Sequence, residues 1–150
     1  MCDFVKNLMT SNTFSTIIAG VFVFVISQLF DEYWLKPIHS YKELRARISY
    51  NLTLYANLYM NPAEYEPENI REERNVASNE LRKLAAEVDS MIELRPLGNF
   101  CIARKRVLSG VSRNLIGLSN NLYAPHTDVA IDQNENRCKE IYRLFKIRNK

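Results

Sequence analysis

The sequence predicts an all-α protein in which one N-terminal transmembrane helix precedes an antiparallel bundle of about four amphipathic helices. Three observations predict this class. An uncharged run, residues 14–30, holds eleven Phe, Ile, Val and Leu residues. The rest of the chain repeats apolar residues at helical spacings of three and four, without strand-like alternation. The 150 residues include only 4 glycines and 5 prolines, few for a β-rich or loop-rich protein.

The apolar run reads FSTIIAGVFVFVISQLF. As a helix its 17 residues span about 26 Å, slightly less than the ~30 Å hydrocarbon core of a bilayer. Tyr33, Trp34 and Lys36 follow it and are residue types typical of a membrane interface. The eleven apolar residues favour insertion by about 3–7 kcal/mol. We therefore expect a short segment 1–13, a transmembrane helix over 14–35 and a helical domain over 36–150.

Two other readings of the run are weaker. A buried core helix is rarely apolar on every face, as residues 21–26 would be. A cleaved signal peptide needs a basic N-terminal region, and only Lys6 is basic there, beside Asp3. A membrane anchor is the preferred interpretation.

The distribution of basic residues predicts the orientation. Lys6 is the one basic residue before the run, whereas four lie soon after it: Lys36, Lys42, Arg45 and Arg47. The positive-inside rule places residues from about 36 onward in the cytoplasm and the N-terminus outside the inner (plasma) membrane. Three widely spaced cysteines agree with a reducing compartment and give no disulfide framework: Cys2, Cys101 and Cys138.

Apolar residues at helical spacing predict the first two helices of the domain over 36–150, which are called the first and second body helices. After a short break at Pro37, residues 41–59 carry one stripe: Tyr41, Leu44, Ile48, Leu52, Tyr55 and Tyr59. Asn61-Pro62 is a stop signal for that helix. The second helix is expected over 67–94, with acidic residues in its first turns and a second stripe: Ile70, Ala77, Leu81, Leu84, Val88 and Met91.

The last two body helices have predicted caps. Asn99 is the expected N-cap of a third helix that carries Phe100 and a stripe ending at Leu122. Gly110 and Gly117 lie seven apart on one face of it and are candidate points of close helix contact. Thr127 or Asp128 caps a fourth helix, with its own stripe: Ile131, Cys138, Ile141, Tyr142 and Phe145. Short connections favour an antiparallel bundle.

The sequence contains no recognisable catalytic or metal-binding motif. His39 and His126 are isolated, so no zinc-ligand spacing exists. Phosphate-loop, dinucleotide, metalloprotease and nucleophile-elbow motifs are missing. Acidic residues between Glu64 and Glu93 fall where a solvated helix face places them. We expect no catalytic, cofactor or metal site and no small-molecule substrate. A third hypothesis, weaker than the two given below, is an enzyme whose catalytic residues are dispersed along the sequence.

Two sets of residues are candidates for binding. Tyr50, Tyr55 and Tyr59 could form a protein-binding face, since Tyr is favoured at interfaces, or could bury their rings in the bundle. Residues 62–95 carry nine acidic and five basic groups, whereas residues 96–150 carry ten basic and four acidic ones. The basic cluster Arg104, Lys105 and Arg106 could contact anionic lipid, or could be a solvated face partly paired with the acidic helix. A nucleic-acid site is not expected on a tethered domain.

Four stretches, IIAGVFVFVISQ, KPIHSYKELRARISYNLTLYANLYMNP, ASNELRKLAAEV and RNLIGLSNNLY, resemble those of a group of uncharacterised bacterial single-pass membrane-anchored proteins. The resemblance extends from about Ser15 to Tyr123 and concerns the order of these stretches and their residues. It implies a bacterial inner-membrane protein with a helical cytoplasmic domain. It implies no activity, cofactor or functional residue.

The sequence thus favours a non-enzymatic, membrane-tethered helical module that binds a protein partner or associates with itself, with the lipid bilayer as a further partner. The alternative is a membrane-acting effector, whose cytoplasmic bundle oligomerises and clusters the anchors until the bilayer is permeabilised. Ser15, Thr16, Ser27 and Gln28 could line such a cluster, although Gly20 has no GxxxG partner.

Overall fold

The computed structural model describes residues 12–60, 68–93, 102–124 and 127–146. Every regular element in these ranges is a helix, which confirms the predicted all-α class. Contacts within the chain divide it into two compact units, residues 1–38 and residues 39–150. Each unit is described by itself.

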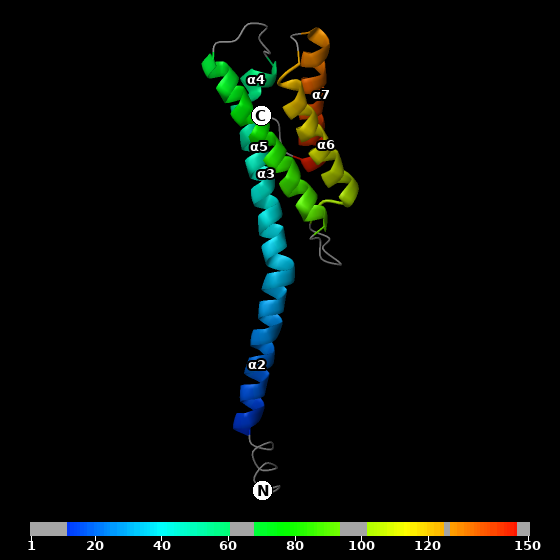
Figure 1. Cartoon of the computed structure of the whole chain (residues 1–150). Coiled ribbons are helices and arrows are strands. Elements are labelled where there is room, and N and C mark those ends of the chain that lie inside the picture. The colour runs from blue at the N-terminus through cyan, green and yellow to red at the C-terminus, as the bar shows by residue number, and fades with distance from the viewer. Residues whose placement is uncertain (1–11, 61–67, 94–101, 125–126, 147–150) are drawn as a thin grey trace. The chain divides into compact units, whose positions relative to one another are not determined.

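The first unit contains α2, Asn12–Phe30, followed by a π-helical turn, η1, Asp31–Leu35 (Figure 1). From Ile17 to Phe30 the large apolar side chains of α2 are exposed. A helix that begins at Phe14 is long and apolar enough to cross a membrane. Transfer of such exposed apolar side chains from water into an apolar medium is favourable.

The predicted break at Pro37 is not formed. No non-helical residue lies between η1 and α3, which spans Lys36–Leu54 and has Pro37 as its second residue. The backbone N–H of Lys36 donates to the carbonyl of Asp31, five residues back. Such a wider turn directly before proline accommodates a residue that has no N–H to donate and whose ring crowds the preceding turn.

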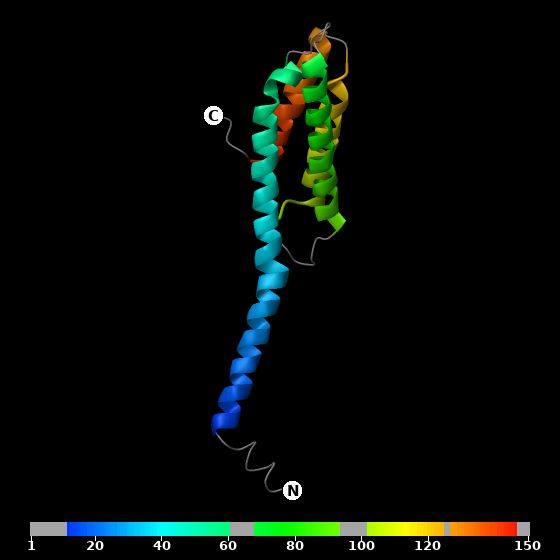
Figure 2. The same cartoon turned by 60° about the vertical axis from the view of Figure 1, so that its left-hand side comes forward.

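The second unit contains the rest of α3 and four further helices: α4, Ala56–Met60; α5, Glu68–Glu93; α6, Lys105–Asn121; and α7, Asp128–Phe145. Figures 1 and 2 show α5 beside α6 and α6 beside α7. Side-chain contacts give the directions of these helices. Asp89 meets Ser112 while Ser78 meets Ser119, so α5 and α6 are antiparallel.

Two further pairings complete the bundle. The Tyr41 ring contacts the Phe145 ring near one end, and Asn134 bonds to the Tyr59 carbonyl near the other, so the α3–α4 segment is antiparallel to α7. Arg47 of α3 pairs with Glu87 of α5. The described residues of the second unit therefore form an antiparallel helical bundle.

The predicted apolar stripes form its core. All six residues of the first stripe are buried, as are Ala77, Leu81, Leu84 and Val88 of the second. The third and fourth helices contribute their own buried positions: Leu108, Val111, Leu115, Leu118, Leu122, Cys138, Ile141 and Phe145. Burying a large aliphatic side chain stabilises a fold by about 1.5–3 kcal/mol, so these stripes hold the bundle together.

Two predicted helix boundaries are corrected. The first body helix is interrupted at Tyr55, which separates α3 from α4, and the Leu58 N–H donates to the Tyr55 carbonyl only three residues back. The third begins at Lys105, with Arg104 in the N-cap position, because residues 102–104 are not helical. Asn99 is therefore not its N-cap. Asn99 and Phe100 themselves lie outside the described residues, as do Asn61, Pro62, Pro67 and Leu94.

The other predicted cap and contact points are confirmed. The Thr127 hydroxyl accepts the Ala130 N–H at 3.2 Å and caps α7. A methyl group on Gly110 would lie 3.0 Å from Leu144 Cδ1, and one on Gly117 would overlap the Arg137 guanidinium. Both glycines thus mark places where α7 side chains approach the α6 backbone closely.

Candidate functional site

The predicted interface residues lie in and directly after η1. Tyr33 and Trp34 are exposed, and the Trp34 ring stacks on Phe30 with 5.8 Å between ring centroids. The Lys36 ammonium forms an ion pair with Glu32 and lies 3.9 Å from Asp31. Aromatic rings beside charged groups at the end of an apolar helix are the arrangement found at the level of lipid head groups. A role for these residues at a membrane interface stays a prediction.

The predicted tyrosine face is not assembled. Tyr50 is 65% exposed, but Tyr55 and Tyr59 are buried among the core side chains. The Tyr59 hydroxyl donates to the Leu52 carbonyl. Tyr55 and Tyr59 therefore belong to the core and not to a protein-binding surface. The reason is their position on the stripe that faces α7, whereas Tyr50 falls on the opposite side of α3.

One apolar pair remains on that outer side. Tyr50 and Leu54 are 65% and 52% exposed and lie four residues apart on α3, so their side chains are neighbours. Exposed apolar residues are common one at a time and carry more meaning when adjacent. The outer face of α3 is thus the part of the predicted tyrosine surface that the fold leaves accessible.

The predicted basic cluster lies at the start of α6. Arg104, Lys105 and Arg106 are all exposed. Of the three, Arg106 also lines a cavity between α6 and α7, together with Arg113 of α6 and Arg143 of α7.

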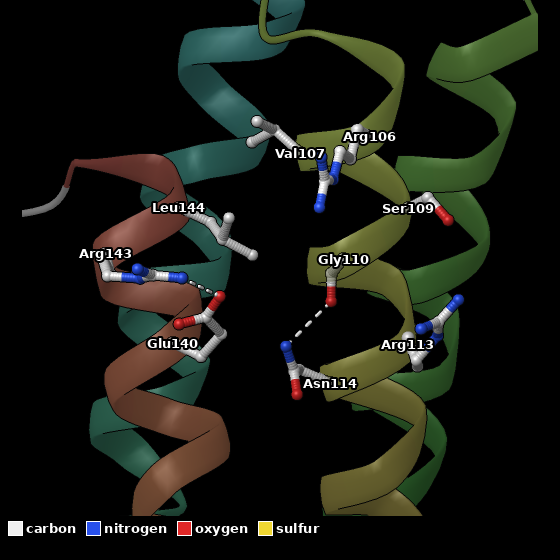
Figure 3. Close-up of a pocket in the computed structure, with 9 residues that line it drawn as sticks. All are labelled: Arg106, Val107, Ser109, Gly110, Arg113, Asn114, Glu140, Arg143 and Leu144. Carbon is white, nitrogen blue, oxygen red and sulfur yellow. Dashed lines mark hydrogen bonds and ion pairs between the residues drawn. The ribbon is translucent and has the colours of Figure 1, made fainter.

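This cavity has a volume of about 610 Å³ (Figure 3). Its lining residues come from α6 (Arg106, Val107, Ser109, Gly110, Arg113 and Asn114) and from α7 (Glu140, Arg143 and Leu144). Figure 3 shows the Arg106 side chain extending along α6 toward Gly110, with the Glu140–Arg143 pair on the opposite wall. In that pair Arg143 Nη2 lies 2.6 Å from Glu140 Oε1.

The charges of the cavity are unbalanced. Arg143 is neutralised by Glu140, but Arg106 and Arg113 form no ion pair with any described residue. Among the lining residues, three guanidinium groups stand against one carboxylate. The cavity is therefore suited to a negatively charged group and unsuited to a cation.

A second cavity, of about 280 Å³, lies between α3 and α5. The Arg47 guanidinium crosses it and meets Glu87 with two hydrogen bonds, 2.7 Å and 2.9 Å long. Arg47 and Glu87 are thus paired with each other, and Glu43 also lines this cavity.

Polar groups buried between α5 and α6 bond to one another. The Ser78 and Ser119 hydroxyls are 2.8 Å apart, and Arg82 Nε donates to the Ser119 oxygen over 2.9 Å. The buried Arg74 guanidinium donates to the Leu122 carbonyl at 2.6 Å, at the end of α6 where helix carbonyls lack partners. Burial lowers the pKa of Arg74 from its ordinary value. These bonds tie α5 to α6.

Cys138 is buried beside Tyr59. Burial is the main cause that raises the pKa of its thiol to about 11, so the thiol is protonated at neutral pH. A reactive cysteine needs an exposed, stabilised thiolate. Within the described ranges no three His, Cys, Asp or Glu side chains are grouped to hold a metal ion.

The anion-suited cavity was not predicted as a unit. Its signal in the sequence is the spacing of Arg106, Gly110 and Arg113, since steps of four and three place two cations on one helix face with a side-chain-free position between them. The wall from α7 could not be read from sequence, because it depends on the register of the two helices.

Comparisons with protein-family models, with curated proteins and with solved structures found no match to this chain.

Proposed function

We propose that this protein is a membrane-tethered, non-enzymatic helical module whose bundle binds a protein partner or a second copy of itself. The observation that carries the proposal is the contrast between the two units. One presents an uncharged, exposed apolar helix, and the other buries its apolar stripes in a core of its own. Such a chain holds a folded surface at a bilayer.

The charge distribution supports a cytoplasmic position for the bundle. Four basic residues follow the apolar helix closely, against Lys6 before it. The buried, protonated Cys138 is compatible with a reducing compartment. We therefore propose an inner-membrane protein with its N-terminus outside and its bundle in the cytoplasm.

The bundle interior supports a non-catalytic role. Its buried serines, its buried arginine and Asn134 bond to neighbouring helices, and its cysteine is protonated. An active site usually gathers titratable groups with perturbed pKa values in a cleft. In the bundle the groups with shifted pKa values include core groups such as Tyr59, Arg74 and Cys138, and two exposed arginines, Arg47 and Arg143, whose pKa values are raised by their ion pairs.

The partner surface is proposed on the outer face of α3. Tyr and aliphatic side chains contribute contact area at interfaces with little loss of conformational entropy. Tyr50 and Leu54 supply such a pair.

Photo-cross-linking in intact membranes tests this proposal. A photoreactive amino acid replaces Tyr50 in the full chain, and the matched control carries it at Lys83, an exposed position on α5. We expect a discrete cross-linked species, either a dimer or one other protein, from position 50 and a weaker or different one from position 83. Monomer alone from position 50 under irradiation would contradict the proposal.

A second measurement separates the module from a permeabilising effector. Expression of the full chain is followed with a membrane-potential dye. We expect unchanged potential and growth, because a tether needs no pore. Depolarisation that depends on the bundle would favour the effector instead.

A further inference from the structure

The strongest feature outside the proposed partner surface is the cavity between α6 and α7. Arg106, Gly110 and Arg113 occupy one face of α6, and all three line the cavity. Gly110 costs about 1 kcal/mol of helix stability relative to alanine. A Cβ there would lie 3.0 Å from Leu144 Cδ1, so the glycine lets α7 approach α6 closely beside the cavity.

The chemistry of the lining selects an anion with several oxygen atoms. Guanidinium groups donate in a planar fork that matches the oxygens of phosphate and carboxylate. The Asn114 side chain lies on the side of α6 that faces α7 and is held in place by its bond to the Gly110 carbonyl, 2.9 Å long. A volume of about 610 Å³ exceeds that of one phosphate group and admits a phosphate-bearing head group.

The cavity lies near one end of the bundle. The Tyr41–Phe145 ring contact places the start of α3 beside the end of α7, and the antiparallel α6 begins at that same end. The cavity therefore lies near the end of the bundle where α7 ends and α6 begins.

We propose that the α6–α7 cavity binds the phosphate group of an anionic ligand between Arg106 on one wall and Arg143 on the other, with Arg113 as a further lining cation. The phosphate is supplied by a lipid head group or by a soluble phosphate compound. Glu140 lies on the wall of the site and opposes binding, because its carboxylate occupies one face of Arg143. The proposed phosphate site is independent of the partner surface proposed on α3, so either one can exist without the other.

The test uses the full chain in nanodiscs with two probes. Native mass spectrometry counts phosphatidylglycerol retained from discs of mixed phosphatidylglycerol and phosphatidylcholine, and calorimetry measures inorganic pyrophosphate binding in discs of phosphatidylcholine alone. Each arginine near an anionic surface is worth about fivefold in affinity. We expect Arg106→Gln with Arg113→Gln to weaken binding about 25-fold.

Two further variants keep the test independent of folding. Arg71→Gln with Lys83→Gln removes the same charge from exposed positions of α5 and should leave binding within twofold. Glu140→Gln should strengthen binding several-fold, which a damaged fold would not do.

The two probes identify the source of the phosphate. Retention of phosphatidylglycerol that is lost in the cavity variant supports a lipid head group. Arginine-dependent pyrophosphate binding without lipid selectivity supports a soluble compound. Absence of both, or equal losses in the cavity variant and the α5 variant, would overturn the proposal.

Discussion

Asn134 is the residue whose removal tests the tertiary arrangement most directly. It is fully buried on α7, where its Nδ2 donates to the Tyr59 carbonyl at 2.8 Å and its Oδ1 accepts from Asn121 Nδ2 at 2.9 Å. One side chain thus links α7 to α4 and to the last residue of α6. We expect Asn134→Ala to lower the free energy of unfolding of the bundle.

The magnitude follows from the two bonds. Leaving a buried acceptor such as the Tyr59 carbonyl without its donor costs about 1–3 kcal/mol. Asn121 is only half-buried, so water can replace part of its lost bond and the second loss is nearer 0.5–1 kcal/mol. The sum, about 2–4 kcal/mol, is a large share of the 5–15 kcal/mol that usually stabilises a domain.

Urea unfolding of the full chain in dodecyl maltoside measures this change, with ellipticity at 222 nm as the signal. At a slope of about 2 kcal/mol/M, the middle of the usual range for urea, the midpoint should fall by roughly 1–2 M. Asn136→Ala, at an exposed position of the same helix, is the matched control and should stay within about 0.5 kcal/mol of the parent protein.

A second variant separates hydrogen bonding from packing. Asn134→Leu keeps most of the volume but leaves the Tyr59 carbonyl without its donor, so it should remain destabilised by at least about 1 kcal/mol. If Asn134→Leu is as stable as the parent, or Asn134→Ala costs no more than Asn136→Ala, the assigned role of the two bonds is refuted.

Three further predictions concern the core, the thiol and the surface. Leu115→Ala should cost about 2–5 kcal/mol in the same urea assay, whereas Ile116→Ala, at an exposed neighbouring position, should cost less than about 1 kcal/mol. Burial raises the pKa of Cys138 from 9.0 to about 11, so the unfolded chain loses this proton first; stability should fall as pH rises from 9 to 11, and Cys138→Ala should remove that part of the slope. With the other two cysteines replaced by serine, Cys138 should also react slowly with maleimide at pH 7 until urea is added. Arg47→Ala should cost less than about 1 kcal/mol, and 1 M NaCl should reduce the difference from the parent, because the pair with Glu87 is exposed on both sides; an undiminished difference would point to packing by the Arg47 stem.

Periodicity predicted the helices and their buried faces well. Tyr41, Leu44, Ile48 and Leu52 recur every three or four residues and all lie in the core, because an α-helix turns through 3.6 residues and aligns them on one side. The cap at Thr127 was equally local, since its hydroxyl bonds to an N–H only three residues ahead.

Predictions that depended on more than one turn of helix were less successful. A break was expected at Pro37, but the five-residue bond before it carries the helix through. No break was expected at Tyr55, where the Tyr59 hydroxyl bonds back to the Leu52 carbonyl and a three-residue turn forms. In both places an alternative hydrogen bond determines the backbone conformation, and the pattern of apolar residues does not predict that bond.

By itself the sequence determined an uncharged apolar helix, a set of amphipathic helices and the spacing of arginines around Gly110. Only the tertiary structure decided that Tyr55 and Tyr59 are core residues while Tyr50 is accessible. It also decided that Glu140 and Arg143 of α7 face Arg106 across a cavity. The physical reason is that each helix fixes its own faces through local geometry, whereas the residues that meet between helices are set by their register, which depends on the packing of the whole bundle.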